Sequence, residues 1–211
     1  MLRLHGYFRS SAAWRVRIAL NLKGLAAEHA FHHLRHGGQR AAEYLRLNPQ
    51  GLVPALETEG GAVLTQSLAI CEWLDETHPA PPLLPGGTLE RARVRAFALA
   101  IACDIHPVQN LKVLVRLRAV PLPEEQVTGW ARWVVGDGLA ACEALIADAA
   151  GPFCFGAAPT LADLCLVPQL HNARRFGCDL QGLPRLLAAE AECNALPAFA
   201  QAAPDRQGDA E

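Results

Sequence analysis

The chain has 211 residues, of which 51% are hydrophobic and 19% charged, a balance that predicts a folded globular protein and argues against a disordered one. Its formal net charge of -2 supplies no basic surface of the kind that binds nucleic acid or an anionic membrane. No apolar run reaches the roughly 18 residues that a membrane-spanning helix needs. A chain of this length forms either one large domain or two small ones.

The first eighty residues alternate between short strands and helices, which indicates an α/β domain. Four strands are expected, at about residues 2–7, 28–34, 53–57 and 62–65. Three helices are expected between and after them, at about residues 11–24, 41–47 and 67–78, with Ser67 as the cap of the third. This order of elements is that of thioredoxin-like folds.

Two hydroxyl residues, Ser10 and Ser11, stand where the first predicted strand runs into the first predicted helix. Serine is favoured at a helix start because its oxygen accepts a hydrogen bond from the unpaired first-turn amides. The same amides, together with the helix dipole and a spare hydroxyl, can also hold a small anion such as a thiolate. An ordinary helix cap and an anion site therefore both remain open at this turn.

A proline, Pro54, begins the third predicted strand, a position expected at a sheet edge or in a turn. A cis Val53–Pro54 bond would expose the amide and carbonyl of Val53 to an extended peptide. The trans state is the commoner one for such bonds. The sequence alone does not decide between the cis and the trans state.

A stretch rich in proline and glycine, residues 79–87, divides the chain into domains expected at 1–82 and 88–211. Beyond it the pattern is helical, with helices expected at about residues 89–103, 108–118, 124–147 and 160–176. Thr160 and Asp163 have the spacing of a capping box at the start of the last of these. The segment from Pro204 onward is polar, and we expect it to be frayed.

Seven cysteines, an odd number, lack CxxC spacing and any Cys/His spacing typical of a metal site. Most have apolar neighbours, as Cys71 and Cys165 do, which predicts small buried side chains in a reducing compartment. The chain opens on a predicted strand instead of a signal sequence. We therefore expect a cytoplasmic protein without a metal.

Several motifs, in this order, resemble those of cytosolic glutathione S-transferases. They are Ser10-Ser11 at the first helix and the segments 48–54 (NPQGLVP), 66–70 (QSLAI) and 160–164 (TLADL). The pattern SSxxxRVRIALxLKG at 10–24, with Gln109-Asn110 and residues 164–169, further resembles the zeta class, the maleylacetoacetate isomerases, whose bacterial relatives include maleylpyruvate isomerases. The resemblance implies the fold of a thioredoxin-like N-terminal domain followed by an all-helical C-terminal domain.

The resemblance also implies a glutathione site, with Val53 pairing main chain to main chain and Gln66 and Ser67 binding the γ-glutamyl carboxylate. The residues of the N-terminal domain implied to contact glutathione are Ser10, Ser11, Gln39, Val53, Pro54, Gln66 and Ser67. Those of the helical domain, acting in the same subunit or across a homodimer, are Asp104, His106, Gln109 and Asn110. Arg9 and Arg175 are implied to bind a dicarboxylate substrate, whereas we expect Arg15 and Arg17 to be structural.

The chemistry implied is glutathione-dependent cis–trans isomerisation of a maleyl-type dicarboxylate, such as maleylacetoacetate to fumarylacetoacetate, in aromatic and tyrosine catabolism. A thiolate adds to the conjugated double bond, which then rotates before the thiol leaves. Lowering a thiol pKa from about 8.5 by about two units requires roughly 2.7 kcal/mol. A helix dipole and one serine hydrogen bond supply this together and neither does alone. We therefore expect Ser10 to face the thiolate, with Ser11 as helper or helix cap.

Other functions stay open at this point. Many zeta enzymes have cysteine at the position of Ala12, so dehalogenation of α-haloacids is doubtful for this chain. Maleylpyruvate is the alternative substrate, and a non-catalytic glutathione-binding regulatory protein of the same fold is the alternative class. A thioredoxin-type disulfide reductase is disfavoured because no CxxC occupies the first turn.

Overall fold

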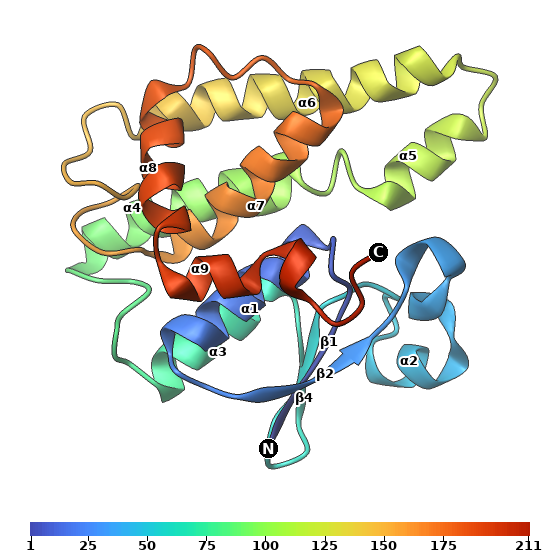
Figure 1. The fold of residues 1–211 in the computed structure, drawn as a ribbon, viewed down its shortest axis with the longest axis horizontal. Helices are drawn as coiled ribbons and strands as arrows, with labels where there is room; N and C mark the ends of the chain where they lie inside the picture. Colours follow the sequence, from blue (N-terminus) through green and yellow to red (C-terminus); the bar gives the residue numbers. More distant parts are fainter. The chain divides into compact units, whose positions relative to one another are not determined.

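Four short strands form one sheet in the order β2-β1-β3-β4. In the computed structural model, which describes residues 1–211, the strands are β1 (Leu2–Gly6), β2 (Ala27–Phe31), β3 (Ala55–Glu57) and β4 (Val63–Thr65). β1 pairs parallel with β2 and antiparallel with β3, and β3 pairs antiparallel with β4. Because a parallel pair needs a crossover connection, α1 (Ser11–Leu22) joins β1 to β2, as Figure 1 shows. This confirms the predicted thioredoxin-like order.

The first compact unit consists of residues 1–83 and 194–211. Besides the sheet and α1, it contains α2 (Ala42–Leu47), α3 (Ser67–Thr77), α9 (Pro197–Ala202) and a short 3-10 turn, η4 (Pro204–Arg206). α1 packs against both α3 and α9, so it is buried on nearly all sides. A helix in that position needs apolar residues all round or polar ones with internal partners.

Two buried arginines on α1, Arg15 and Arg17, have such partners. Arg15 is 1% exposed and donates from Nη1 to Ser67 Oγ at 3.3 Å. Arg17 is 4% exposed and donates from Nε to Ala202 O at 2.9 Å and from Nη2 to Phe8 O at 3.0 Å. The prediction that both arginines hold the first helix to its neighbours is confirmed.

The segment after residue 193 differs from expectation in two ways. We expected it to belong to a second domain at 88–211, but it packs with the first unit: Phe199 is 1% exposed, and Asn21 of α1 donates to Ala198 O at 2.9 Å. The expectation of a frayed segment from Pro204 is wrong. Pro204 is buried, and Asp209 accepts a hydrogen bond from Phe8 N at 3.0 Å.

The regular elements of the second unit, residues 84–193, are helices. Its elements are α4 (Thr88–Leu99), a π-helical turn η3 (Ala100–Ile105), α5 (Leu111–Arg118), α6 (Glu124–Leu145), α7 (Leu161–Phe176) and α8 (Pro184–Asn194), the last ending one residue beyond the unit. α7 packs against α4, α6 and η3, and most of its residues are buried. The predicted capping box of Thr160 and Asp163 is confirmed.

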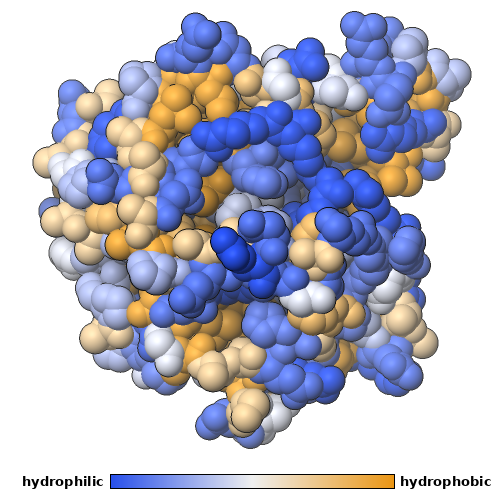
Figure 2. Space-filling model, in the orientation of Figure 1, coloured by the Kyte–Doolittle hydropathy of each residue, from blue (hydrophilic) through white to orange (hydrophobic).

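No helix of the structure is both long enough and apolar enough to cross a membrane. On the face in Figure 2, hydrophilic residues are interspersed with smaller groups of apolar ones. Five of the seven cysteines are buried, as predicted, and burial raises the pKa of Cys142 to about 12.

A glycine of α6, Gly138, lets this helix approach η3 closely. A Cβ atom added at Gly138 would lie 2.4 Å from Ile105 Cγ1, and Ile105 is only 2% exposed. A Cβ added at Gly136 in the same helix would meet no atom within 4 Å. Gly136 is therefore a matched control for Gly138.

We predict that Gly138→Ala is less stable than Gly136→Ala by about 1–3 kcal/mol, the usual cost of overpacking. Both variants gain the same helix propensity of about 1 kcal/mol, so this gain cancels in the comparison. Urea denaturation followed by circular dichroism measures the difference. Equal unfolding free energies would mean that Ile105 moves aside at no cost.

Candidate functional site

The β1–α1 turn presents a serine hydroxyl at the start of a helix. Ser10 is the N-cap of α1: its Oγ accepts a hydrogen bond from Ala13 N at 3.2 Å, and its own amide donates to Tyr7 O at 3.0 Å. Ser11 is not the cap, which was one of the two roles expected for it, since it is the first helical residue and is buried. Because Ser10 Oγ only accepts within the cap, its proton can still be donated to a group outside the helix.

The segment before β3 is fixed by side-chain hydrogen bonds. The Val53–Pro54 bond is cis. Tyr44 and Asn48 both donate to Leu52 O, at 2.6 and 2.7 Å. Val53 belongs to a buried cluster with Tyr7, Phe8, Tyr44 and Ala55. The main chain at Val53 is therefore held next to the residues that lead into Ser10.

The start of α3 combines an unusual backbone with a buried positive charge. Gln66 has φ +69°, the one positive φ of a non-glycine residue in the chain, and its Nε2 donates to Gln50 Oε1 at 3.0 Å. Ser67 is the first residue of α3 and accepts from Arg15 Nη1, so the prediction that it caps α3 is wrong. A helix N-terminus beside a guanidinium favours an anion such as a carboxylate.

Gln39 lies in a 3-10 turn, η2 (Gly38–Arg40), between β2 and α2. Its Nε2 donates to Leu34 O at 3.3 Å, whereas its Oε1 is buried and has no hydrogen-bond partner. An unpartnered buried oxygen is costly, and a ligand that donates a hydrogen bond removes this cost. The turn is close to the segment before β3, because a Cβ atom added at Gly51 would lie 3.1 Å from Gln39 O.

Three contacts link the predicted residues of the first unit indirectly. Val53 shares a buried cluster with Phe8, which precedes Ser10; Gly51, next to the Val53 segment, lies close to Gln39; and Arg15, on the helix that begins at Ser11, contacts Ser67. Sequence reasoning missed two residues that complete this arrangement, Gln50 and Arg15. The position of Gln50 inside the segment 48–54 was the only signal for the first. Nothing local in the sequence connects Arg15 with Ser67, which lies 52 residues away.

Four further predicted residues belong to the second unit: Asp104 lies near the end of η3, and His106, Gln109 and Asn110 lie in the turn between η3 and α5. Asp104 is exposed, His106 is half-buried, and Gln109 is 2% exposed. Asn110 caps α5 by accepting from Lys112 N at 3.1 Å, and its Nδ2 lies 3.4 Å from His106 Nε2.

The predicted substrate arginines differ in their surroundings. Arg9, in the β1–α1 turn, is half-buried, with its guanidinium 5.9 Å from the centre of the Phe8 ring. Arg175, near the end of α7, is exposed and stacks over Phe176 at 4.9 Å. Its neighbour Arg174 instead binds both carboxylate oxygens of Glu190.

Comparisons with known proteins define the class first. Residues 9–77 match the family model of the glutathione S-transferase N-terminal domain. A holo structure of a maleyl pyruvate isomerase, described as a bacterial glutathione S-transferase of the zeta class, matches with a TM-score of 0.96 and 44% identity, covering 99% of this chain and 100% of that one. The fold is therefore that of a glutathione S-transferase, as predicted.

Full-length relatives narrow the class to one family. A probable maleylacetoacetate isomerase of Vibrio cholerae is 50% identical over 99% of this chain and 98% of its own length. A crystal structure of maleylacetoacetate isomerase from Anaeromyxobacter dehalogenans, with glutathione bound in the active site, matches with a TM-score of 0.91 and 49% identity over 100% and 98% of the two chains. The chain belongs to the zeta-class glutathione S-transferases, the family of maleylacetoacetate and maleylpyruvate isomerases.

The backbone at Gln66 can be tested for strain by comparing two substitutions. A residue in such a conformation costs about 1–3 kcal/mol unless it is glycine. Gln66→Gly and Gln66→Ala both lose the contact with Gln50. We predict that the glycine variant is the more stable of the two by about 1 kcal/mol, measured by chemical denaturation, because only glycine relieves the strain. A more stable alanine variant would contradict a strained backbone at this position.

Proposed function

We propose that this protein is an enzyme that isomerises a maleyl-type dicarboxylate, maleylacetoacetate to fumarylacetoacetate, with glutathione as cofactor, in aromatic and tyrosine catabolism. The observation that carries the proposal is the β1–α1 turn, where Ser10 caps α1 and keeps a proton to donate. The identity of about half of all residues with a probable maleylacetoacetate isomerase supports the same activity. We further propose that the enzyme works in the cytoplasm as a homodimer, as the family resemblance implies.

Three groups of residues in the first unit suit different parts of glutathione. The N-terminus of α3, with Gln66, Ser67 and the nearby guanidinium of Arg15, suits the γ-glutamyl carboxylate. The main chain at Val53, beside the cis bond to Pro54, suits the cysteinyl peptide group. The unpartnered Oε1 of Gln39 suits a donor elsewhere on the tripeptide. When bound, glutathione supplies the sulfur nucleophile that allows the conjugated double bond to rotate.

Ser10 and the α1 N-terminus would together hold that sulfur in its ionised form. Lowering a thiol pKa by about two units requires roughly 2.7 kcal/mol. The helix dipole contributes about 0.3–1 kcal/mol, and up to about 2 kcal/mol in a partly buried site. A hydrogen bond to a charged group contributes about 1.5–3 kcal/mol, so a bond of average strength meets the requirement only together with the dipole. Accepting from Ala13 N also polarises the Ser10 hydroxyl and strengthens its donation. Ser11, one residue on, acts as helper in this proposal.

A dicarboxylate needs cations, and we assign this role to Arg9 and Arg175. Arg174 is less suited to it, because both ends of its guanidinium are engaged by Glu190. We assign Asp104, His106, Gln109 and Asn110 to glutathione binding from the helical domain, within one subunit or across the dimer. The high structural similarity to a maleyl pyruvate isomerase makes maleylpyruvate the second candidate substrate.

The function is tested by following the isomerisation of maleylacetoacetate and of maleylpyruvate by ultraviolet absorbance, each with and without glutathione. We expect turnover of maleylacetoacetate that requires glutathione and leaves its concentration unchanged. Faster turnover of maleylpyruvate would identify the second substrate as the physiological one. Retention on immobilised glutathione without isomerisation of either compound would contradict an enzyme and favour a regulatory glutathione-binding protein.

The role of Ser10 is tested by two substitutions that separate its hydroxyl from its capping function. Ser10→Ala removes both, whereas Ser10→Gly keeps a fair helix cap and removes only the hydroxyl. We predict that both variants lose roughly 10- to 100-fold in kcat, the equivalent of one charge-assisted hydrogen bond, while glutathione affinity changes little. The pH at which kcat reaches half its plateau should rise by about one unit or more.

Loss of activity in Ser10→Ala alone would mean that the cap matters and the hydroxyl does not. Unchanged turnover in both variants would transfer the thiolate role to another group, Ser11 first. Ser11→Ala, measured in parallel, distinguishes these outcomes.

A further inference from the structure

Residues 204–211, the C-terminal segment, contact the turn that carries Ser10. Asp209 Oδ2 accepts a hydrogen bond from Phe8 N at 3.0 Å, although the two residues are 201 positions apart. Phe8 lies two residues before Ser10, and its side chain is 7% exposed. A bond from an ionised carboxylate to a main-chain amide is stronger than one between neutral groups.

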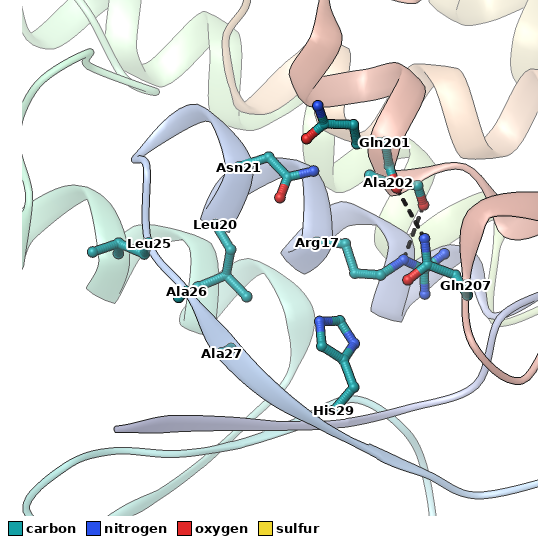
Figure 3. A pocket seen from close by; sticks show the side chains of 10 residues that line it. All are labelled: Arg17, Leu20, Asn21, Leu25, Ala26, Ala27, His29, Gln201, Ala202 and Gln207. Atoms are coloured by element: carbon teal, nitrogen blue, oxygen red, sulfur yellow. Dashed lines mark hydrogen bonds between the residues drawn. The ribbon is translucent and has the colours of Figure 1, made fainter.

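The carbonyl of Phe8 is held as well, by Arg17 of α1. Arg17 donates from Nη2 to Phe8 O at 3.0 Å and from Nε to Ala202 O at 2.9 Å, just before the C-terminal segment. Figure 3 shows the Arg17 side chain reaching toward Ala202 and Gln207. The amide of Phe8 is therefore bound by Asp209, and its carbonyl is bound by Arg17, which also binds Ala202.

Arg17 also lines a hollow beside the C-terminal segment. Arg17, His29 and Gln207 line a cavity of about 300 Å³ between α1, β2 and the end of the chain (Figure 3). Burial lowers the pKa of Arg17 to about 10, and the Asp209 carboxylate counteracts this shift. Asp209 Oδ1 is buried without a hydrogen-bond partner, so the carboxylate is held here at a desolvation cost.

We propose that Asp209 is a positioning residue that fixes Phe8 and, through it, the place of the Ser10 hydroxyl. The path is short: Tyr7 O, on the peptide unit that contains the Phe8 amide, accepts the hydrogen bond from Ser10 N at 3.0 Å. If the turn loosens, Ser10 is less often at hydrogen-bond distance from the sulfur. This role rests on the proposed function of Ser10.

Asp209→Ala and Asp209→Asn test the proposal, with Asp205→Asn as the matched control. Asp205 is in the same segment, its side chain is 77% exposed, and its ion pair is with the adjacent Arg206. Asp209→Ala should lower kcat by roughly tenfold or more, because small displacements of catalytic groups have effects of up to about 100-fold. It should also shift the acidic limb of the kcat–pH profile to higher pH.

The asparagine variant provides a conservative rescue. Its side-chain oxygen can still accept a hydrogen bond from Phe8 N, so Asp209→Asn should retain more of kcat than Asp209→Ala. It should also fold even if the alanine variant does not. Asp205→Asn should behave as the wild type does.

Amide hydrogen exchange measures the same contact without any substrate. The amides of Phe8 and Ser10 should exchange faster in Asp209→Ala than in the wild type and in Asp205→Asn, with Asp209→Asn closer to the wild type. Unchanged exchange at these amides in Asp209→Ala overturns the proposal whatever the activity. An active wild type whose kcat and pH profile survive Asp209→Ala overturns the role of Asp209 alone. A wild type that isomerises neither substrate overturns the proposed function, and this role with it.

Discussion

The burial of α1 is the constraint on which the site depends. Its first turn must present unpaired amides and the Ser10 hydroxyl, while the rest of the helix is enclosed by α3 and α9. Two guanidinium groups make this possible because each has polar partners inside the unit: Arg15 binds Ser67, and Arg17 binds main-chain carbonyls. A buried charge without such partners would cost several kcal/mol.

The same two arginines connect the structural core to the chemistry. Arg15 brings positive charge to the start of α3, where the peptide carboxylate of the cofactor is proposed to bind. Arg17 connects the β1–α1 turn with α9. One helix therefore organises both ends of the proposed glutathione site, and substitutions at either arginine would disturb folding and binding together.

Much of this arrangement could be predicted from the sequence, because it depends on local signals. The thioredoxin-like order of elements follows from short-range periodicity, and the capping box of Thr160 and Asp163 involves residues three positions apart. The features that were missed depend on residues distant in the chain. Ser67 is the first residue of α3 instead of its cap, and its hydroxyl accepts a hydrogen bond from Arg15. The C-terminal segment contacts the first strand-to-helix turn through Asp209 and Phe8. Likewise, the π-helical turn packs against a glycine of α6 more than thirty residues away.

The burial of the cysteines has a consequence for an enzyme whose proposed substrate is an electrophile. Maleyl compounds are Michael acceptors and alkylate accessible thiolates. Five cysteines are enclosed, burial raises the pKa of Cys142 and Cys193, and Ala12 puts no sulfur in the first turn of α1. Apart from the exposed Cys103 and the partly exposed Cys178, the protein is thus shielded from inactivation by its own reactant.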